Sequence, residues 1–180
     1  MMINIYSNLQ TLIMKHSFFI GAYWGARKES LEVCTEKLHN MFAFLQKVDS
    51  SFQYWYKTEK PKKGQPVEPI ILSKNAIINL LAASLNYNDD GILNEDLGYT
   101  VHLKSGKDFS KAHVLSVTCG CYHKLIPNSV TLNIGKNERH EHLTDKTALK
   151  DIYTAIVSIW NPNNGVIRCN DIHLLSETYS

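Results

Sequence analysis

The segment SFFIGAYWGARKESLEVCTEKLHNMFAFLQKV, residues 17–48, contains the change of pattern that decides the fold. Its first part, Ser17 to Trp24, is aromatic and β-branched around one glycine, which is typical of a largely buried strand. From Leu31 to Val48 the apolar residues recur every three or four positions, which predicts a helix of about five turns with one buried face. A buried strand therefore leads into a long amphipathic helix through residues 25–30.

Two more helices are predicted farther along the chain. Ser73 is a candidate N-cap for a shorter helix whose apolar face runs from Ile77 to Leu85. Either Thr144 or Asp145 caps another helix, which ends before Asn161-Pro162 because proline cannot continue it.

Between these helices the pattern changes to alternation of apolar and polar side chains. Residues 99–104, 113–118 and 129–134 alternate in this way, which predicts three strands with one buried face each. A last segment, Val166 to Leu175, is predicted to be one bent strand. Strands that cluster between helices favour an α+β fold: a single domain with a mainly antiparallel sheet and helices packed on one face.

Length and composition agree with one folded domain. At roughly 150 residues per domain, 180 residues make about one; we assign residues 17–180 to it and residues 1–16 to an N-terminal extension. The 19 basic and 17 acidic residues give a net charge of +2, too small for a general electrostatic hold on nucleic acid. The sequence shows neither a transmembrane run nor a signal peptide, so we expect a cytoplasmic protein with no membrane or nucleic-acid partner.

Three residues that follow the predicted strand at 113–118 could carry metal chemistry. In Cys119-Gly-Cys121-Tyr-His123, alternating side chains would project from one face of a strand, and thiolates and imidazoles are good zinc ligands. A fourth ligand is missing, so we interpret the cysteines as packed, reduced thiols. A small enzyme or metal-binding protein built on these residues is the alternative. The sequence has no P-loop, nucleophile elbow or dinucleotide fingerprint, so we expect no catalytic residues, no metal and no cofactor.

An aromatic segment is the first candidate for contact with a protein partner. Tyr54, Trp55 and Tyr56 stand beside a lysine-rich loop, and exposed aromatic rings commonly anchor interfaces. The alternatives are packing of Trp55 in the core, or stacking of the three rings on nucleic-acid bases.

An acidic segment is the second candidate. It holds four carboxylates with no basic residue between them, and their summed charge is −4: Asp89, Asp90, Glu95 and Asp96. Such a cluster could dock on a cationic surface, for example the phosphate-binding cleft of a nuclease, where it would steer association and exclude the substrate. A solvated loop is the alternative.

One tract resembles a known family. FIGAYWGARKESLEVC, residues 19–34, resembles the opening of the immunity protein 52 family, which occurs beside bacterial polymorphic toxins. The aromatic segment 52–56 and Leu97-Gly98-Tyr99 are also similar to that family. The resemblance implies an α+β immunity protein that binds and neutralises a cognate toxin, often a restriction-endonuclease-like DNase, and that has no catalytic activity of its own.

Overall fold

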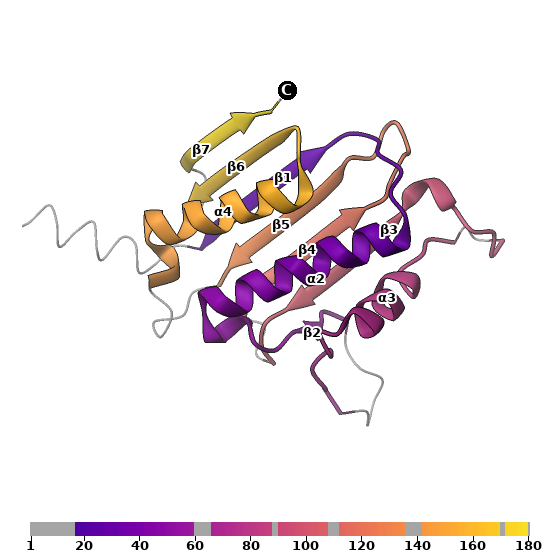
Figure 1. Ribbon diagram of the computed structural model, residues 1–180, viewed down its shortest axis with the longest axis horizontal. Helices are drawn as coiled ribbons and strands as arrows, with labels where there is room; N and C mark the ends of the chain where they lie inside the picture. The colour runs from indigo at the N-terminus through magenta and orange to yellow at the C-terminus, as the bar shows by residue number, and fades with distance from the viewer. Residues whose placement is uncertain are drawn as a thin grey trace, which may run out of the picture.

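In the computed structural model, seven strands form one antiparallel sheet within the described residues, which are 17–59, 66–87, 90–107, 112–135, 142–169 and 172–179. The strand order is β2-β3-β4-β5-β1-β6-β7, so the first strand lies inside the sheet between β5 and β6 (Figure 1). The strands are β1 (Phe18–Trp24), β2 (Tyr56–Lys57), β3 (Tyr99–Lys104), β4 (Val114–Cys119), β5 (Asn128–Ile134), β6 (Asn164–Cys169) and β7 (Ile172–Thr178).

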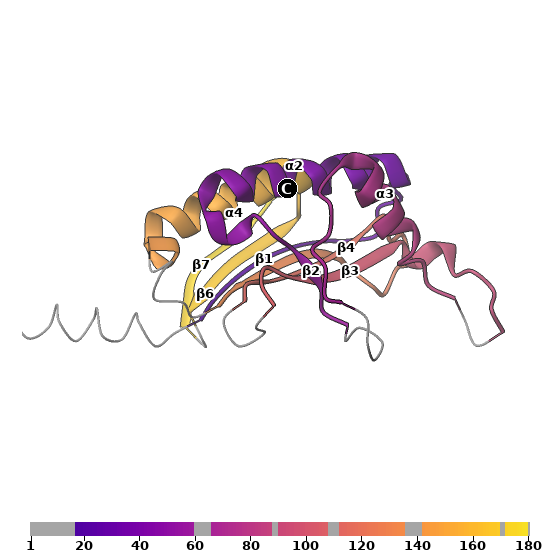
Figure 2. The ribbon, with the colours of Figure 1, turned by 90° about the horizontal axis from the view of Figure 1, so that it is seen from below.

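Three helices of the described chain lie on one face of this sheet (Figure 2). They are α2 (Leu31–Val48), α3 (Lys74–Ala82) and α4 (Lys146–Trp160). Helices α2 and α4 lie side by side over the strands, and α3 packs against α2 and β3 toward the β2 edge. The predicted α+β class, with an antiparallel sheet and helices on one face, is confirmed. The predicted extension, residues 1–16, lies outside the described residues.

The core forms between the helices and the sheet because each strand turns alternate side chains toward the helices. Ile20, Leu115 and Val130 face the helices and are fully buried. At one end of this layer the rings of Trp24 and Trp160 stack with their centroids 5.6 Å apart. The helix-facing residues of the strands therefore make the core continuous from the β2 edge to β6.

On the opposite face of the sheet, β3 and β4 carry polar side chains that meet across the strands. On this face the hydroxyls of Thr100 and Thr118 lie 3.3 Å apart across β3 and β4. Two residues farther along the same two strands, His102 Nδ1 lies 3.0 Å from Ser116 Oγ. Such cross-strand pairs stabilise a face that no described helix covers.

Side-chain caps fix the beginning of each helix. Ser30 accepts a hydrogen bond from the backbone N–H of Val33 at the start of α2. Ser73 caps α3 and Asp145 caps α4, and of the two candidates for that last position the structure selects Asp145. Each cap satisfies a backbone donor that would otherwise lack a partner. None of the helices in the described ranges is long and apolar enough to cross a membrane.

Two elements differ from the sequence-based expectations. Residues 166–175 are predicted as one bent strand, but residues 166–169 lie in β6 and residues 172–175 in β7. These two strands pair antiparallel with an irregularity at Ile167/Arg168. The segment around Trp55, for which the sequence predicts no strand, contributes β2 to the edge of the sheet. Local patterning misses both because each strand exists only through pairing with a neighbour.

Candidate interaction surface

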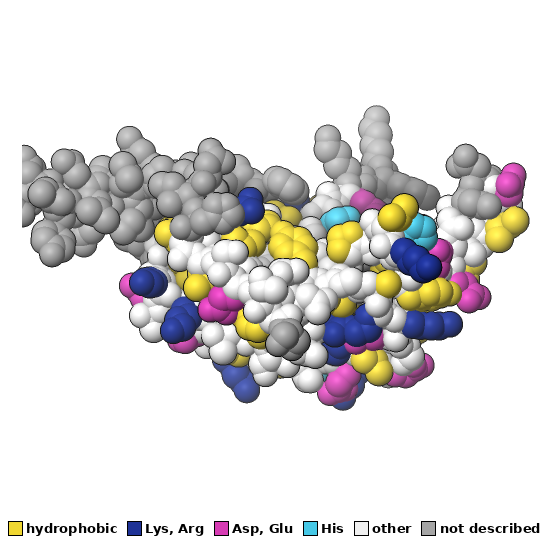
Figure 3. All heavy atoms as spheres, turned by 90° about the horizontal axis from the view of Figure 1, so that it is seen from above, with side chains coloured by type: hydrophobic (Ala, Val, Ile, Leu, Met, Phe, Trp, Pro, Cys, Tyr) yellow, Lys and Arg dark blue, Asp and Glu magenta, His cyan; other side chains and the backbone are white. Residues whose placement is uncertain are grey.

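One end of the sheet, which we call the loop end, gathers the connections that bear most of the candidate residues. Trp24 pairs with Asn128, and Tyr99 pairs with Cys119, so β1 and β4 end where β3 and β5 begin. The connections that meet there lie at the right of Figure 1 and include residues 25–30, 90–98 and 120–127. Figure 3 shows acidic, basic, histidine and hydrophobic side chains close together at this end of the molecule.

The segment after β1 ties the loop end to α4 through Arg27. Its guanidinium donates to the carbonyl oxygens of Trp160 at 2.6 Å and Asn161 at 3.0 Å, which are the last acceptors of α4. The same group lies 4.9 Å from the centre of the Trp24 ring. A cation at the carboxyl end of a helix also complements the helix dipole. Arg27 therefore locks β1, α4 and the first connection together.

Glu29 continues this link toward α2. Its carboxylate forms an ion pair with Lys37 on α2, and Arg27 Nε lies 3.3 Å from the same carboxylate oxygen. The Glu29 side chain is only 10% exposed, so solvent screens these contacts weakly. The charged residues of the 25–30 connection are thus largely engaged within the fold, although Lys28 is exposed, with its ammonium 4.8 Å from the centre of the Tyr122 ring.

A hollow of about 310 Å³ opens beside this connection. It lies between residues 24–27, the α4–β6 connection at 161–163, and Tyr179 after β7. Asn163 Oδ1 accepts from the Gly25 N–H at 3.2 Å, and the Asn163 N–H donates to the Tyr23 carbonyl at 2.9 Å. These bonds fix the walls of the hollow.

The acidic loop, defined as residues 90–96, projects beyond the sheet at the loop end. Asp90 and Glu95 are exposed, and the Asp96 side chain is 41% exposed. Asp89 lies outside the described residues. A bridge between Tyr87 and Leu93 closes the base of the loop. The structure therefore presents three of the four predicted carboxylates together at one end of the molecule.

Gly98 attaches the acidic loop to β3. Its φ of 63° lies in the left-handed region, and a Cβ at this position would overlap the carbonyl oxygen of Cys119. Close to Gly98, the backbone N–H groups of Tyr122 and His123 donate hydrogen bonds to the Asp96 carbonyl oxygen, at 2.9 Å and 3.0 Å. The acidic loop and the β4–β5 loop, residues 120–127, are therefore joined.

The three aromatic candidates, Tyr54, Trp55 and Tyr56, differ in exposure and do not form one exposed aromatic surface. Trp55 is 0% exposed and packs between Phe42 and Phe52, with ring centroids 5.6 Å and 5.9 Å away. The expectation that Trp55 is an exposed anchor is wrong, because its ring packs against Phe42 of α2 and against Phe52. Tyr56 is 8% exposed, whereas Tyr54 is 64% exposed.

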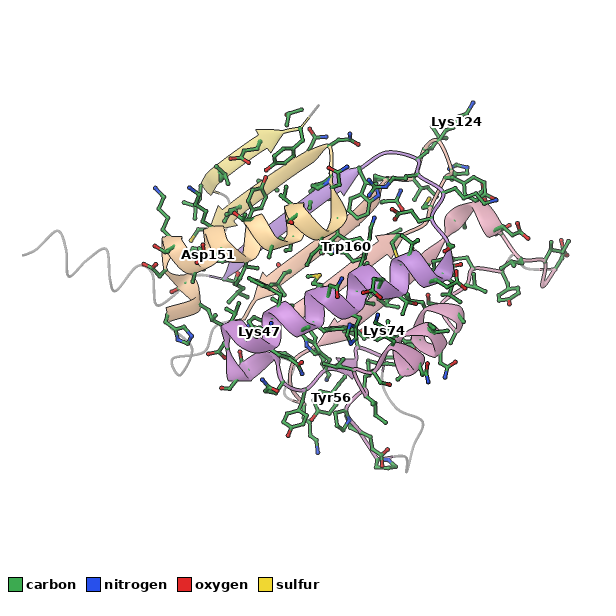
Figure 4. All side chains as sticks on the ribbon, in the orientation of Figure 1. Lys47, Tyr56, Lys74, Lys124, Asp151 and Trp160 are labelled. Atoms are coloured by element: carbon green, nitrogen blue, oxygen red, sulfur yellow. The ribbon has the colours of Figure 1, made fainter. Side chains whose placement is uncertain are left out.

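The position of the aromatic segment also separates it from the loop end. Tyr56 pairs with Lys104, at the opposite end of β3 from Gly98 (Figure 4). Tyr54 and the acidic loop therefore lie toward opposite ends of β3. Contact of Tyr54 with a partner stays a prediction.

The three residues of the possible metal site take different partners. A hydrogen bond with Cys34, together with burial, holds the pKa of the Cys119 thiol well above its usual value. Cys121 Sγ donates to the Ile126 carbonyl at 3.4 Å, and His123 Nδ1 accepts from the Leu125 N–H at 3.2 Å. Gly120, with φ 70°, breaks the alternation that would align the side chains. Within the described part of the chain no group of three or more His, Cys, Asp or Glu could hold a metal ion.

Sequence reasoning missed the exposed hydrophobic residues of the loop end. Tyr87, Ile92 and Leu125 are 61%, 62% and 86% exposed. The available signal was an apolar pair, Leu125-Ile126, inside a connection between two strands. Leu125 and Ile126 lie between β4 and β5 and not within a strand, so neither side chain is placed on the buried face of the sheet, and both are exposed.

The fold is shared with a larger bacterial protein. The T6SS protein PA0821 of Pseudomonas aeruginosa is similar in structure, with a TM-score of 0.51 and 14% sequence identity. The similarity covers 86% of this chain and 40% of that one, so this chain spans about two-fifths of the length of its relative. No curated protein matches the sequence.

The family is defined by the sequence as a whole. The sequence model of the family described as "Immunity protein 52" matches residues 16–177, which is nearly the entire chain. The protein belongs to the immunity protein 52 family, as the tract at residues 19–34 indicated.

Proposed function

We propose that this protein binds a cognate bacterial toxin in the cytoplasm and neutralises it by occupying its surface, without catalysis. The toxin that fits best is a nuclease, of the restriction-endonuclease-like DNase type. The acidic loop is the observation that carries this proposal. This chain belongs to the immunity protein 52 family and presents that loop at one end of its sheet. The Cys119, Cys121 and His123 alternative has no comparable support.

The electrostatics explain why a nuclease is the favoured target. A nuclease binds phosphates with a cationic cleft, and a protein with a net charge of only +2 needs a local patch of opposite sign to approach it. Asp90, Glu95 and Asp96 supply that patch in the described residues, and Asp89 adds a fourth carboxylate in the sequence. Fixed carboxylates steer encounter and compete with the phosphates of the substrate.

Neutralising two of these carboxylates tests the proposal. In Asp90→Asn/Glu95→Gln, we expect association with the cognate toxin to slow severalfold at low salt. The deficit should shrink as salt rises, because added ions screen the steering field of the native protein. Stopped-flow association at low and high salt measures both effects.

A charge-matched control separates steering by the acidic loop from a change in net charge. Glu68→Gln/Asp151→Asn removes two exposed carboxylates far from the loop end, and Figure 4 shows Asp151 at the opposite end of the molecule. This control should associate at the native rate. Equal slowing of both double variants, or of neither, would show that the acidic loop is an ordinary solvated loop.

A further inference from the structure

The β4–β5 loop carries the most exposed large hydrophobic residue of the described chain. Leu125 is 86% exposed, and Ile126 beside it is 39% exposed. A single exposed leucine is common on protein surfaces and needs no explanation by itself. The loop is unusual because of how firmly its backbone is held.

A buried asparagine fixes the base of the β4–β5 loop. The Asn128 side chain, 0% exposed, accepts from the Cys121 N–H at 2.9 Å and donates to the carbonyl oxygens of Cys121 and Gly25, both at 2.8 Å. Such buried, fully used amides rigidify the segments that they join. The loop is therefore bound to β5 and to the segment after β1.

The tip of the loop is closed by its own hydrogen bonds. The Leu125 N–H donates to His123 Nδ1 at 3.2 Å, the Ile126 N–H donates to the His123 carbonyl at 3.4 Å, and the Ile126 carbonyl accepts from Cys121 Sγ. These bonds use backbone groups on the inner side of the loop, while the Leu125 side chain stays exposed. A loop whose backbone is held in this way loses little backbone freedom on binding, which favours affinity.

The β4–β5 loop also forms one body with the acidic loop. The Asp96 carbonyl accepts from the backbone N–H groups of both Tyr122 and His123, and His123 Nε2 lies 4.0 Å from an Asp96 carboxylate oxygen. Lys124, next to Leu125, points away from the molecule at this end (Figure 4). A partner that meets the carboxylates of the acidic loop therefore meets Leu125 in the same contact.

We infer that Leu125 is the apolar anchor of the toxin contact and enters a hydrophobic pocket on the toxin, bordered by basic side chains that face the acidic loop. This inference rests on the proposed function, because it names the partner of the same surface. A binding interface needs a central aromatic or aliphatic anchor in a pocket and a polar rim around it. Leu125 and Asp96 supply these two parts from joined loops.

Truncation of Leu125 tests the inference. With the cognate toxin, we expect Leu125→Ala to raise the dissociation constant about 30-fold, mainly through faster dissociation. This loss should be nearly the same at low and high salt, unlike the loss from the acidic-loop variant. Leu125→Met keeps the apolar volume and should stay within about threefold of the native value. Surface plasmon resonance supplies both rate constants.

A matched control lies elsewhere on the surface. Ile71 is 72% exposed and follows Ile70, which pairs with Trp55 near the β2 edge. Ile71→Ala removes similar exposed apolar area and should bind as the native protein does. If Leu125→Ala and Ile71→Ala bind equally well, the inference is wrong and the acidic-loop proposal is unaffected.

Two other outcomes would also overturn the inference. If the native protein is a dimer by light scattering and Leu125→Ala is a monomer with native toxin affinity, the loop is a contact between two copies of this chain. If the native protein does not bind the toxin at all, the proposed function fails and the inference fails with it. Circular dichroism of each variant establishes that the comparison is between folded proteins.

Discussion

At the scale of single residues, Arg27 shows that a conspicuous charged residue can serve the fold. Its guanidinium replaces the missing hydrogen-bond partners of the last α4 carbonyls and lies over the Trp24 ring. The planar fork of arginine reaches two carbonyl oxygens at once, which a lysine ammonium does less well. The sequence alone places Arg27 at a strand-to-helix junction but does not identify the helix that it caps.

Replacement of Arg27 should reduce stability. We expect Arg27→Ala to lower the free energy of unfolding by about 1–3 kcal/mol, because two helix-terminal carbonyls lose a charged donor. Arg27→Lys should recover part of that loss. Lys28→Ala, which removes one exposed ammonium near the Tyr122 ring, should cost less than about 1 kcal/mol. Urea denaturation followed by circular dichroism gives all three values, and an equal effect of the Arg27 and Lys28 changes would contradict the capping role.

Trp55 is a residue whose role the sequence left open. Its position between two tyrosines beside a lysine-rich loop suggests exposure, and the alternative of core packing is the one that the structure supports. The deciding contacts come from Phe42 on α2 and from Phe52, which local periodicity does not bring next to Trp55. Burial of this kind depends on tertiary packing and is not encoded in the neighbouring residues.

Trp55→Ala should therefore act on stability rather than on binding alone. Removal of a fully buried tryptophan is expected to cost about 3–5 kcal/mol. Trp55→Phe should cost less, since it keeps much of the ring and removes an indole N–H that has no partner among the described residues. Tyr54→Ala, at the exposed neighbour, should change the unfolding free energy by no more than about 0.5 kcal/mol. Thermal and urea unfolding would refute this assignment if Trp55→Ala and Tyr54→Ala proved equally mild.

At the scale of elements, Gly98 determines where the acidic loop sits. The residue combines a positive φ with contact against the backbone of Cys119, so β3 and the end of β4 meet without room for a side chain. The family-like tripeptide Leu97-Gly98-Tyr99 marks this junction in the sequence. What the sequence does not show is that the junction also holds the β4–β5 loop through Asp96.

Gly98→Ala should destabilise the protein by more than about 1 kcal/mol, through both backbone strain and overlap. Gly25→Ala is the control, because its Cβ would meet no atom within 4 Å and its φ is not positive. The control should leave the free energy of unfolding nearly unchanged. Urea denaturation checks both, and amide hydrogen exchange should show faster exchange at Tyr122 and His123 only in the Gly98 variant. Native protection of those two amides would disprove the link between the loops.

Elements with their own periodicity were predictable, and elements that depend on pairing were not. Helices α2, α3 and α4 carry apolar stripes and polar caps, and β3, β4 and β5 alternate clearly, so each was expected near its observed bounds. In contrast, β2 has two residues and is a strand only because Tyr56 and Lys57 pair with β3. The division between β6 and β7 likewise follows from their antiparallel pairing.

At the scale of the whole molecule, the net charge conceals how the charges are distributed. The chain is slightly basic overall, yet residues 89–96 contain four of its 17 acidic residues and no basic one. Glu29 and Lys37 pair with each other inside the fold. Association is governed by the field near the contact rather than by the total charge. A basic immunity protein can therefore approach a basic toxin if it presents the loop end.

The proposed mode of action, occupation without catalysis, has a consequence in stoichiometry. An inhibitor that works by binding removes one toxin per chain, whereas an enzyme turns over and inactivates an excess of toxin with time. With the toxin well above the dissociation constant, nuclease activity on plasmid DNA should fall linearly with added protein and vanish near equimolar amounts. Titrations read after short and long incubation should coincide. Inactivation that deepens with time at substoichiometric protein would instead indicate turnover, and the Cys119, Cys121 and His123 group would then become the first residues to replace.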